Sequence, residues 1–170
     1  MRWRLVTGVQ TGVDRAALDV ARELGLPHGG WCPAGRWAED GVIPPEYPLD
    51  ETPSADPRQR TEWNVRDSDV TWILTRGPLQ GGTRYAWEVA RRLGKPVRIF
   101  EVDRLPDSAA RAALRTELAR IDTLHVAGPR ESEAPGIGAA ARAWLRAVLG
   151  HGEPEGAGDA TVANDDVEHP

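Results

Sequence analysis

Two glycine-rich turns, each placed between a short apolar run and a helical pattern, most constrain how this chain can fold. The first turn, at 8–14, follows the apolar run 3–6, and the second, at 77–83, follows the run 70–74. Glycines there allow positive φ and a close approach of the backbone to a ligand. The helix that follows offers unpaired N–H groups and a partial positive charge, as in sites for phosphate and other anions. Two such turns on strands of one parallel sheet predict a shared ligand crevice.

The rest of the chain alternates apolar runs with helical patterns. Strands are expected at 2–7, 28–33, 70–74, 97–100 and 124–126, and helices at 11–24, from 57 onward, and at 84–93, 108–121 and 136–149. Alternation of this kind is typical of a parallel sheet with helices on both faces. The expected fold class is therefore α/β: a Rossmann-like, doubly wound, mainly parallel sheet covered by helices on both faces.

Local signals mark where the first two helices begin. Thr11 and Asp14 have the spacing of a capping box, with Asp in place of the usual Glu. Gly25 is a C-terminal stop signal for the same helix. Asp56 followed by Pro57 is the pattern of an N-cap and a first helical residue. These signals predict one helix that is capped by Thr11 and a second that starts at Pro57.

The segment 34–55 is rich in proline, glycine and charge and has no hydrophobic period. A long irregular segment inside a compact domain is usually functional or disordered. Trp37, Tyr47 and Leu49 give this one apolar anchors. We therefore expect an ordered loop that lies over the crevice.

Composition limits the class of protein. The 170 residues suffice for one domain with a core, and 40% are hydrophobic and 28% charged. No 18-residue apolar stretch occurs, and the N-terminal residues lack the apolar segment of a signal peptide. The single cysteine, Cys32, excludes an intramolecular disulfide. A cytoplasmic protein without a membrane partner is expected.

The acidic balance of the chain arises at its C-terminal end. Residues 151–170 hold six acids and no Lys or Arg, so the other residues are close to neutral. We expect a ligand-binding domain at 1–150 and, because its hydrophobicity is low, an acidic disordered tail at 151–170. No basic run with interleaved aromatic residues occurs. A nucleic-acid partner is therefore not expected.

Six motifs carry a resemblance to a known family. They are Gly-Val-Gln-Thr-Gly-Val-Asp-Arg-Ala-Ala-Leu-Asp (8–19), His-Gly-Gly-Trp-Cys-Pro (28–33), Ala-Glu-Asp-Gly (38–41), Arg-Thr-Glu-Trp-Asn-Val-Arg-Asp-Ser-Asp (60–69), Gly-Gly-Thr (81–83) and Ala-Gly-Pro-Arg-Glu-Ser (127–132). In this order they resemble the putative molybdenum-cofactor carrier family. That family is similar to a Rossmann-like nucleotide-sensor group that includes the lysine-decarboxylase-like cytokinin-releasing hydrolases.

The resemblance implies a doubly wound fold and a ligand with a phosphate or nucleotide part. The resemblance implies less about activity, and the function we expect is non-catalytic binding of a phosphorylated small molecule. The candidates are the molybdenum cofactor, held by a carrier, and a nucleotide-like or ADP-ribose-like ligand, held by a sensor. A homo-oligomer is expected, with molybdoenzymes as possible partners.

The hydrolase relatives imply an alternative, an enzyme that cleaves the N-glycosidic bond of a nucleotide. Their glycine turn is followed by a catalytic Glu two or three residues after the Thr, whereas Glu88 comes five residues after Thr83. On a helix, a shift of two residues rotates a side chain by about 200°. That rotation favours the binder over the hydrolase. A scaffold with a vestigial crevice is disfavoured because both glycine turns are intact.

The expected ligand contacts lie at the two turns, on the helix after Pro57 and after the last strand. They are Gly8, Gln10, Thr11, Gly12, Asn64, Gly81, Gly82, Thr83 and Arg130. Arg130 either binds phosphate in a bidentate manner or braces two loops through a Glu. Asn64 shares a helix face with Arg60 and Asp67, and this face either lines the crevice or carries an Arg60–Asp67 surface pair.

Other polar residues have plainer interpretations. Thr11, expected above as a ligand contact, could equally serve only as a helix cap. Glu39 and Asp40 are loop carboxylates, available for acid–base chemistry or simply solvated. His28 and Cys32 are four residues apart without a second pair of ligands, which falls short of a zinc site. We expect no metal ligands and no catalytic residues, and Cys32 is expected to be a small buried side chain.

Overall fold

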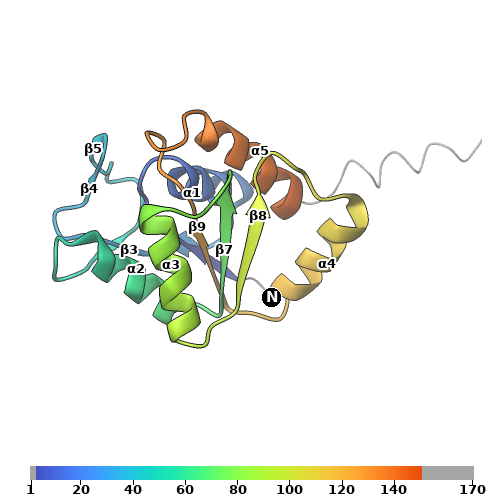
Figure 1. Ribbon diagram of the computed structural model, residues 1–170, viewed down its shortest axis with the longest axis horizontal. Helices are drawn as coiled ribbons and strands as arrows, with labels where there is room; N and C mark the ends of the chain where they lie inside the picture. Colours follow the sequence, from blue (N-terminus) through green and yellow to red (C-terminus); the bar gives the residue numbers. More distant parts are fainter. Residues whose placement is uncertain (1–2, 151–170) are drawn as a thin grey trace, which may run out of the picture.

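The computed structural model describes residues 3–150, and its centre is a five-stranded parallel sheet (Figure 1). The strand order is β2-β1-β9-β7-β8. The strands are β1 (Arg4–Val6), β2 (His28–Gly29), β7 (Val70–Thr75), β8 (Val97–Glu101) and β9 (Thr123–Ala127). The expected α/β, Rossmann-like fold is confirmed. The tail expected at 151–170 lies outside the described residues.

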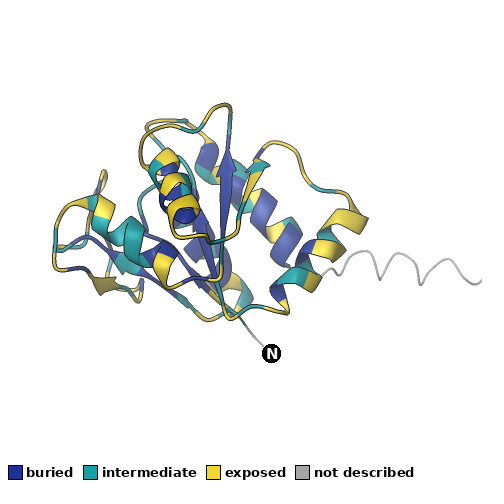
Figure 2. Ribbon diagram, turned by 60° about the horizontal axis from the view of Figure 1, so that its bottom comes forward, coloured by how far each residue is buried: buried dark blue, intermediate teal, exposed yellow. Residues whose placement is uncertain are grey.

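Helices cover both faces of this sheet, as expected (Figures 1 and 2). They are α1 (Val13–Leu24), α2 (Pro57–Arg66), α3 (Gly81–Arg92), α4 (Ser108–Leu118) and α5 (Ile137–Leu149). Trp72 and Leu74 of β7 pack into the core that α1, α4 and α5 form on one face. Ile73, which points to the other face, packs against Ala86 of α3, and α2 lies beside α3. This alternation explains why β7 is apolar along most of its length.

The place of β9 decides where the sheet can bind a ligand. β9 comes last in the chain, yet it lies in the middle of the sheet, between β1 and β7. If β9 preceded β1 in the chain, the strand order would be 3-2-1-4-5, the order of the Rossmann fold. The carboxyl ends of β1 and β7 therefore flank the carboxyl end of β9. The two glycine turns that follow β1 and β7 lie on either side of it.

The start of α1 differs from the capping box expected at Thr11 and Asp14. The N-cap is Gly12, and no side chain caps the helix. Thr11 is not available for this role, because its hydroxyl accepts a hydrogen bond from the Glu131 N–H (3.0 Å) and donates one to Glu39. The Asp14 carboxylate instead accepts a hydrogen bond from the Gln10 N–H (3.2 Å). The Thr11 cap was therefore wrong, whereas the Gly25 stop is confirmed by its left-handed conformation.

The strand expected at 28–33 is interrupted. β2 ends at Gly29, and β3 (Trp31–Cys32) leaves the sheet to pair in parallel with β6 (Asp50–Glu51). Gly30 between them has a φ of +132°, and a Cβ there would overlap the Thr7 carbonyl oxygen. The close approach of two backbones, which only glycine permits, thus divides the run.

The segment 34–55 is ordered, as expected. It contains an antiparallel hairpin of β4 (Trp37–Ala38) and β5 (Gly41–Val42). The buried Tyr47 donates a hydrogen bond to the Asp19 carboxylate of α1 (2.6 Å). Arg36 donates to three carbonyl groups of the same segment, those of Ile43, Pro44 and Tyr47.

The Asp56 N-cap of α2 is confirmed, because its carboxylate accepts from the Arg58 N–H.

Candidate functional site

A cavity of about 430 Å³ lies at the carboxyl ends of β1 and β9, beside the N-terminal end of α3. This volume is within the range of small-molecule sites, roughly 300–1,000 Å³. Seven of the nine expected contact residues line it. They are Gly8, Gln10, Asn64, Gly81, Gly82, Thr83 and Arg130. The structure thus brings residues of both glycine turns to one cavity at the switch point of the sheet.

The N-terminus of α3 opens into this cavity without a cap. The N-cap, Gln80, makes no side-chain hydrogen bond. Within residues 3–150, the N–H groups of Gly81, Gly82 and Thr83 have no hydrogen-bond acceptor. Thr83 is 4% exposed, and its hydroxyl makes no hydrogen bond within the same described part of the chain. Free N–H groups, the helix dipole and a hydroxyl together form a site suited to an anion.

The structure places Thr11 and Gly12 outside this cavity. A Cβ on Gly12 would overlap the Pro129 carbonyl oxygen and lie 2.8 Å from the Glu131 N–H. The Val13 N–H at the start of α1 donates to the same Pro129 carbonyl (3.2 Å). At the first helix start the loop after β9 therefore takes the Val13 N–H, whereas none of the first three N–H groups of α3 has an acceptor within residues 3–150.

Gly8 belongs to the cavity for a reason other than positive φ. The residue with φ > 0 is its neighbour Val9, at +56°, whose N–H is held by the Thr7 hydroxyl (2.8 Å). A Cβ on Gly8 would lie 2.5 Å from the Arg60 guanidinium. Arg60 donates a hydrogen bond to the Gly8 carbonyl (2.9 Å). Glycine at this position makes room for an arginine that comes from α2.

Two titratable groups near this arginine, Asp14 and His125, are buried in the cavity wall. Burial raises the pKa of Asp14 to about 6, and the charge of Arg60 limits that rise. Burial likewise lowers the pKa of Arg60 itself. His125 of β9 has a pKa lowered to about 3, first by burial and then by the charge of Arg60. His125 is therefore neutral at pH 7, and its Nδ1 is hydrogen-bonded to the Thr71 hydroxyl (3.1 Å).

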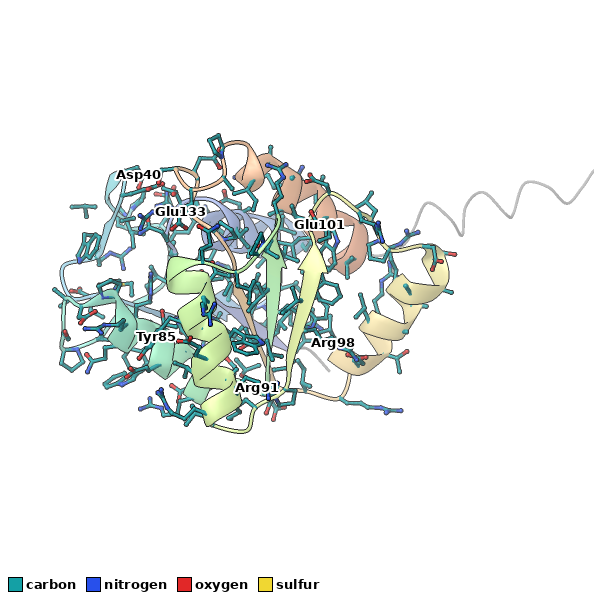
Figure 3. All side chains as sticks on the ribbon, in the orientation of Figure 1. Asp40, Tyr85, Arg91, Arg98, Glu101 and Glu133 are labelled. Carbon is teal, nitrogen blue, oxygen red and sulfur yellow. The ribbon has the colours of Figure 1, made fainter. Side chains whose placement is uncertain are left out.

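Asn64 and Arg130 line the cavity but already have partners in the protein. The Asn64 amide accepts from the Trp31 N–H (2.9 Å) and donates to the Trp31 carbonyl (3.0 Å), which fixes β3 to α2. Arg130 lies 3.3 Å from Glu39 and 3.9 Å from Glu133. Arg130 therefore braces two loops through Glu39 and also lines the cavity. Figure 3 labels Glu133, which lies close to the start of α3.

Two alternatives for the α2 face are now resolved. Asp67 pairs with its neighbour Arg66 (2.7 Å) and accepts from the Trp31 indole (2.9 Å). The surface pair between Arg60 and Asp67 was therefore wrong, and Arg60 lines the cavity instead.

The carboxylates considered for catalysis lie away from the cavity wall. Glu88 pairs with Arg84 (3.1 Å) on the outer side of α3 and does not line the cavity. Glu39 and Asp40 line a separate, shallower concavity beside α1 and α5. Hydrogen bonds from Ser132 and Thr11 lower the pKa of Glu39, and a hydrogen bond from Arg15 lowers that of Asp40. The cavity itself contains Asp14, Asp56 and Glu133.

His28 and Cys32 both have surroundings within the protein that account for them. His28 hydrogen-bonds the Leu26 carbonyl (2.8 Å), and Cys32 is buried with a pKa raised by its burial. Within residues 3–150, no group of three or more His, Cys, Asp or Glu could hold a metal ion.

Sequence reasoning missed His125 and gave Asp14 only the role of a cap. A signal for His125 is present, since it is the polar residue within the apolar run 124–126 and alternates in direction with its neighbours. Trp37, expected only as an anchor of the loop, lines the cavity, and its indole is held by the Ala55 carbonyl (3.2 Å). The loop thus contributes an aromatic ring to the site.

Comparison with known proteins gives one family and one solved structure. The model of the circularly permutated YpsA SLOG family matches residues 5–149. The crystal structure of a protein named "putative molybdenum carrier protein", from Syntrophus aciditrophicus SB, is 39% identical in sequence. The match has a TM-score of 0.80 and covers 87% of this chain and 95% of that one. No curated protein matches the chain.

These similarities and the cavity support a ligand-binding role in general. In the part of the chain that the structure describes, no helix is both long and apolar enough to cross a membrane.

Proposed function

Because the chain belongs to the circularly permutated YpsA SLOG family, we propose that its cavity binds a phosphate-containing small molecule without consuming it. In this role the protein is a carrier or a sensor of its ligand. The molybdenum cofactor is the first candidate, since the similar crystal structure is that of a protein named for carrying molybdenum. A nucleotide-like ligand is the second candidate.

The observation that carries this proposal is the uncapped start of α3. Gly82 contributes a free N–H group and an empty side-chain position, because a Cβ there would meet no heavy atom within 4 Å. Thr83 adds a buried hydroxyl beside it. A phosphate at this point would gain charge-assisted hydrogen bonds and the favourable end of the helix dipole. Gly81 and Gly82 are exposed, so a phosphate in the cavity can reach their N–H groups.

The residues present also fit the molybdenum cofactor. Its phosphate would bind at α3, and its pterin would lie against the ring of Trp37 in the same cavity. The cofactor supplies its own sulfur ligands to the molybdenum, so binding requires hydrogen-bond donors and shape rather than a protein metal site.

The alternative is a nucleotide N-glycosidase, and the position of Glu88 supports the binder against it. Glycoside chemistry normally needs a positioned pair of carboxylates or a substitute. Glu88 is paired with Arg84 on the outer side of α3, as its spacing from Thr83 suggested.

A substitution at Gly82 tests the proposed phosphate site. In Gly82→Glu, the new carboxylate would occupy the anion position and repel phosphate, while an acid in the first turn is compatible with the helix. We expect the affinity for pyrophosphate, measured by titration calorimetry, to fall about 10- to 100-fold. Ser108→Glu, which adds the same charge at the first residue of α4, is the matched control and should bind normally.

Two results would contradict the proposed function. Equal affinity of Gly82→Glu and the original chain for pyrophosphate would exclude α3 as the phosphate site. Sustained release of free base from nucleoside monophosphates or ADP-ribose, followed by chromatography, would make the protein a hydrolase. Mass spectrometry and metal analysis of any molecule that copurifies would identify the natural ligand.

We further propose that the protein acts in the cytoplasm as a homo-oligomer and delivers its ligand to molybdoenzymes. The support for self-association is the segment 93–105, which contains the edge strand β8. Three large apolar side chains of this segment, Leu93, Ile99 and Leu105, are about half exposed. Ile99 lies on β8 and the other two lie before and after this strand, and exposed apolar side chains at the edge of a sheet are typical of contact with another chain.

A further inference from the structure

The cavity contains a second polar group without a complete set of partners, the carboxylate of Asp14. This residue lies in the first turn of α1 and is 8% exposed, yet it lines the cavity. Its Oδ2 accepts a hydrogen bond from the Gln10 N–H. Its Oδ1 accepts no hydrogen bond within residues 3–150, and it is not among the described side-chain atoms that are fully buried without a partner, so it is accessible from the cavity. One carboxylate oxygen is therefore left to the cavity.

Arg60 has the largest electrostatic effect of any charged residue on Asp14, but it does not donate a hydrogen bond to the Asp14 carboxylate. Arg60 donates instead to the Gly8 carbonyl and to the Thr61 hydroxyl (3.2 Å). It forms no ion pair with Asp14 within 4.0 Å. Desolvation of this carboxylate, which raises its pKa, costs free energy of folding. Such groups are concentrated at functional sites, where a ligand completes the hydrogen bonds.

Aromatic side chains elsewhere in the lining of the same cavity favour a planar partner. Trp37, which is 39% exposed, and Tyr85 of α3 both line the cavity. Aromatic rings of this kind pack well against flat heterocycles. A carboxylate is complementary to two adjacent N–H donors on the edge of such a ring, since it accepts two parallel hydrogen bonds.

We propose that Asp14 is the specificity-determining residue of the cavity and accepts hydrogen bonds from the amino and ring N–H groups of a 2-amino-4-oxopyrimidine edge. This inference rests on the proposed function, because the same ligand places its phosphate at α3. Guanine nucleotides and pterin phosphates share this edge. Adenine and hypoxanthine lack the paired donors.

The test compares ligands that differ at this edge alone. Guanosine 5′-monophosphate (GMP), inosine 5′-monophosphate (IMP), which lacks the 2-amino group, and neopterin monophosphate are titrated by calorimetry. We expect GMP or neopterin monophosphate to bind, and any GMP binding to exceed that of IMP about tenfold or more. Which of the two binds tighter distinguishes the nucleotide from the pterin as the source of the edge.

The matched variants are Asp14→Asn and Asp103→Asn. Asp14→Asn keeps an acceptor for the Gln10 N–H but presents an NH₂ group to the ligand edge, so affinity for the edge should fall about 10- to 100-fold. Its affinity for pyrophosphate should stay the same. The apo melting temperature should hold or rise, because a buried charge has been removed. Asp103, paired with Arg76 away from the cavity, is the control.

The pH dependence supplies a readout that a purely structural role of Asp14 would not change. Because the Asp14 pKa is about 6, discrimination of GMP from IMP should increase between pH 5 and pH 7 and stay flat in Asp14→Asn. The charges that act on Asp14 are those of Arg60 from α2 and Arg15 from α1. His125 of β9 stays neutral in this range. Asp56, Arg58, Arg130 and Glu133, which also line the cavity, are held in ion pairs.

Each result decides the proposal. Equal binding of GMP and IMP, unchanged affinity in Asp14→Asn, or no binding of either GMP or neopterin monophosphate would overturn it. If pyrophosphate still binds and Gly82→Glu abolishes that binding, the phosphate site stands without the Asp14 inference. If pyrophosphate does not bind but Asp14→Asn removes the discrimination of GMP from IMP, the Asp14 inference stands and the phosphate site at α3 is excluded.

Discussion

Asp14 and His125 have pKa values that burial displaces in opposite directions. The Asp14 value rises to about 6 and the His125 value falls to about 3, because burial disfavours the charged form of each. Between pH 4 and 6 the native state holds a proton on Asp14 that the unfolded chain releases. The contribution of Asp14 to the stability of the folded state therefore falls as pH rises through this range. His125 acts the other way, since the unfolded chain takes up a proton below about pH 6.5.

The His125 effect gives a prediction at this scale. As pH falls from 6.5 to 5, protonation of this residue in the unfolded chain should lower the free energy of unfolding of the original chain by up to about 2 kcal/mol. In His125→Asn, whose amide can still bond the Thr71 hydroxyl, that loss should disappear. Urea unfolding at pH 5 and pH 7.5 measures the difference. His28→Asn is the control, and a pH dependence that His125→Asn leaves unchanged would contradict the assignment.

At the level of elements, two similar glycine turns have different tasks. None of the first three N–H groups of α3 has an acceptor within residues 3–150, whereas at the start of α1 the Val13 N–H is bonded to the Pro129 carbonyl. The local sequences of the two turns do not distinguish these roles. The loop after β9 does, because it passes over one helix start and leaves the other open.

Two glycine substitutions test this difference. Gly12 and Gly77 have nearly the same φ, +78° and +70°, but a Cβ meets backbone atoms only at Gly12. Gly77→Ala should cost about 1–2 kcal/mol through conformational strain. Gly12→Ala should cost about 2 kcal/mol more, since backbone atoms of residues 129–131 must move. Urea unfolding of both variants checks this, and equal losses would mean that the contact with the 129–131 loop is unimportant.

For the whole molecule, the position of β9 matters most. Strand β9, from late in the chain, completes the middle of the sheet and supplies His125 and Ala127 to the cavity. Folding of the site therefore requires contacts between residues more than 100 positions apart. Such long-range contacts leave no local pattern in the sequence.

The division of the chain at residue 150 remains a prediction. α5 ends at Leu149, and its buried residues Leu145, Val148 and Leu149 complete one face of the core. A chain that ends at Gly150 should therefore keep its melting temperature within about 2 °C. Differential scanning calorimetry of the two chains measures this. A clearly lower melting temperature would show that residues 151–170 contribute to the stability of the core.

The sequence by itself determined the five helices, the approximate places of the five central strands and the class of fold, but not the break at Gly30 or the hairpin at 37–42. Apolar runs, glycine stops and the Asp56 cap are local signals, since they reflect the preferences of neighbouring residues. The two glycine turns, and the direction of Glu88 away from the cavity, could likewise be predicted from local sequence spacing. Seven of the nine predicted contact residues line the cavity for this reason.

Tertiary structure alone decided which side chains share the cavity and which are used elsewhere. Thr11 and Gly12 hold the loop after β9, whereas Arg60 passes under Gly8 from α2. The pKa of Asp14 follows from burial by distant segments rather than from its neighbours in the chain. The physical reason is that desolvation, close backbone contact and hydrogen-bond completion depend on which surfaces meet after folding.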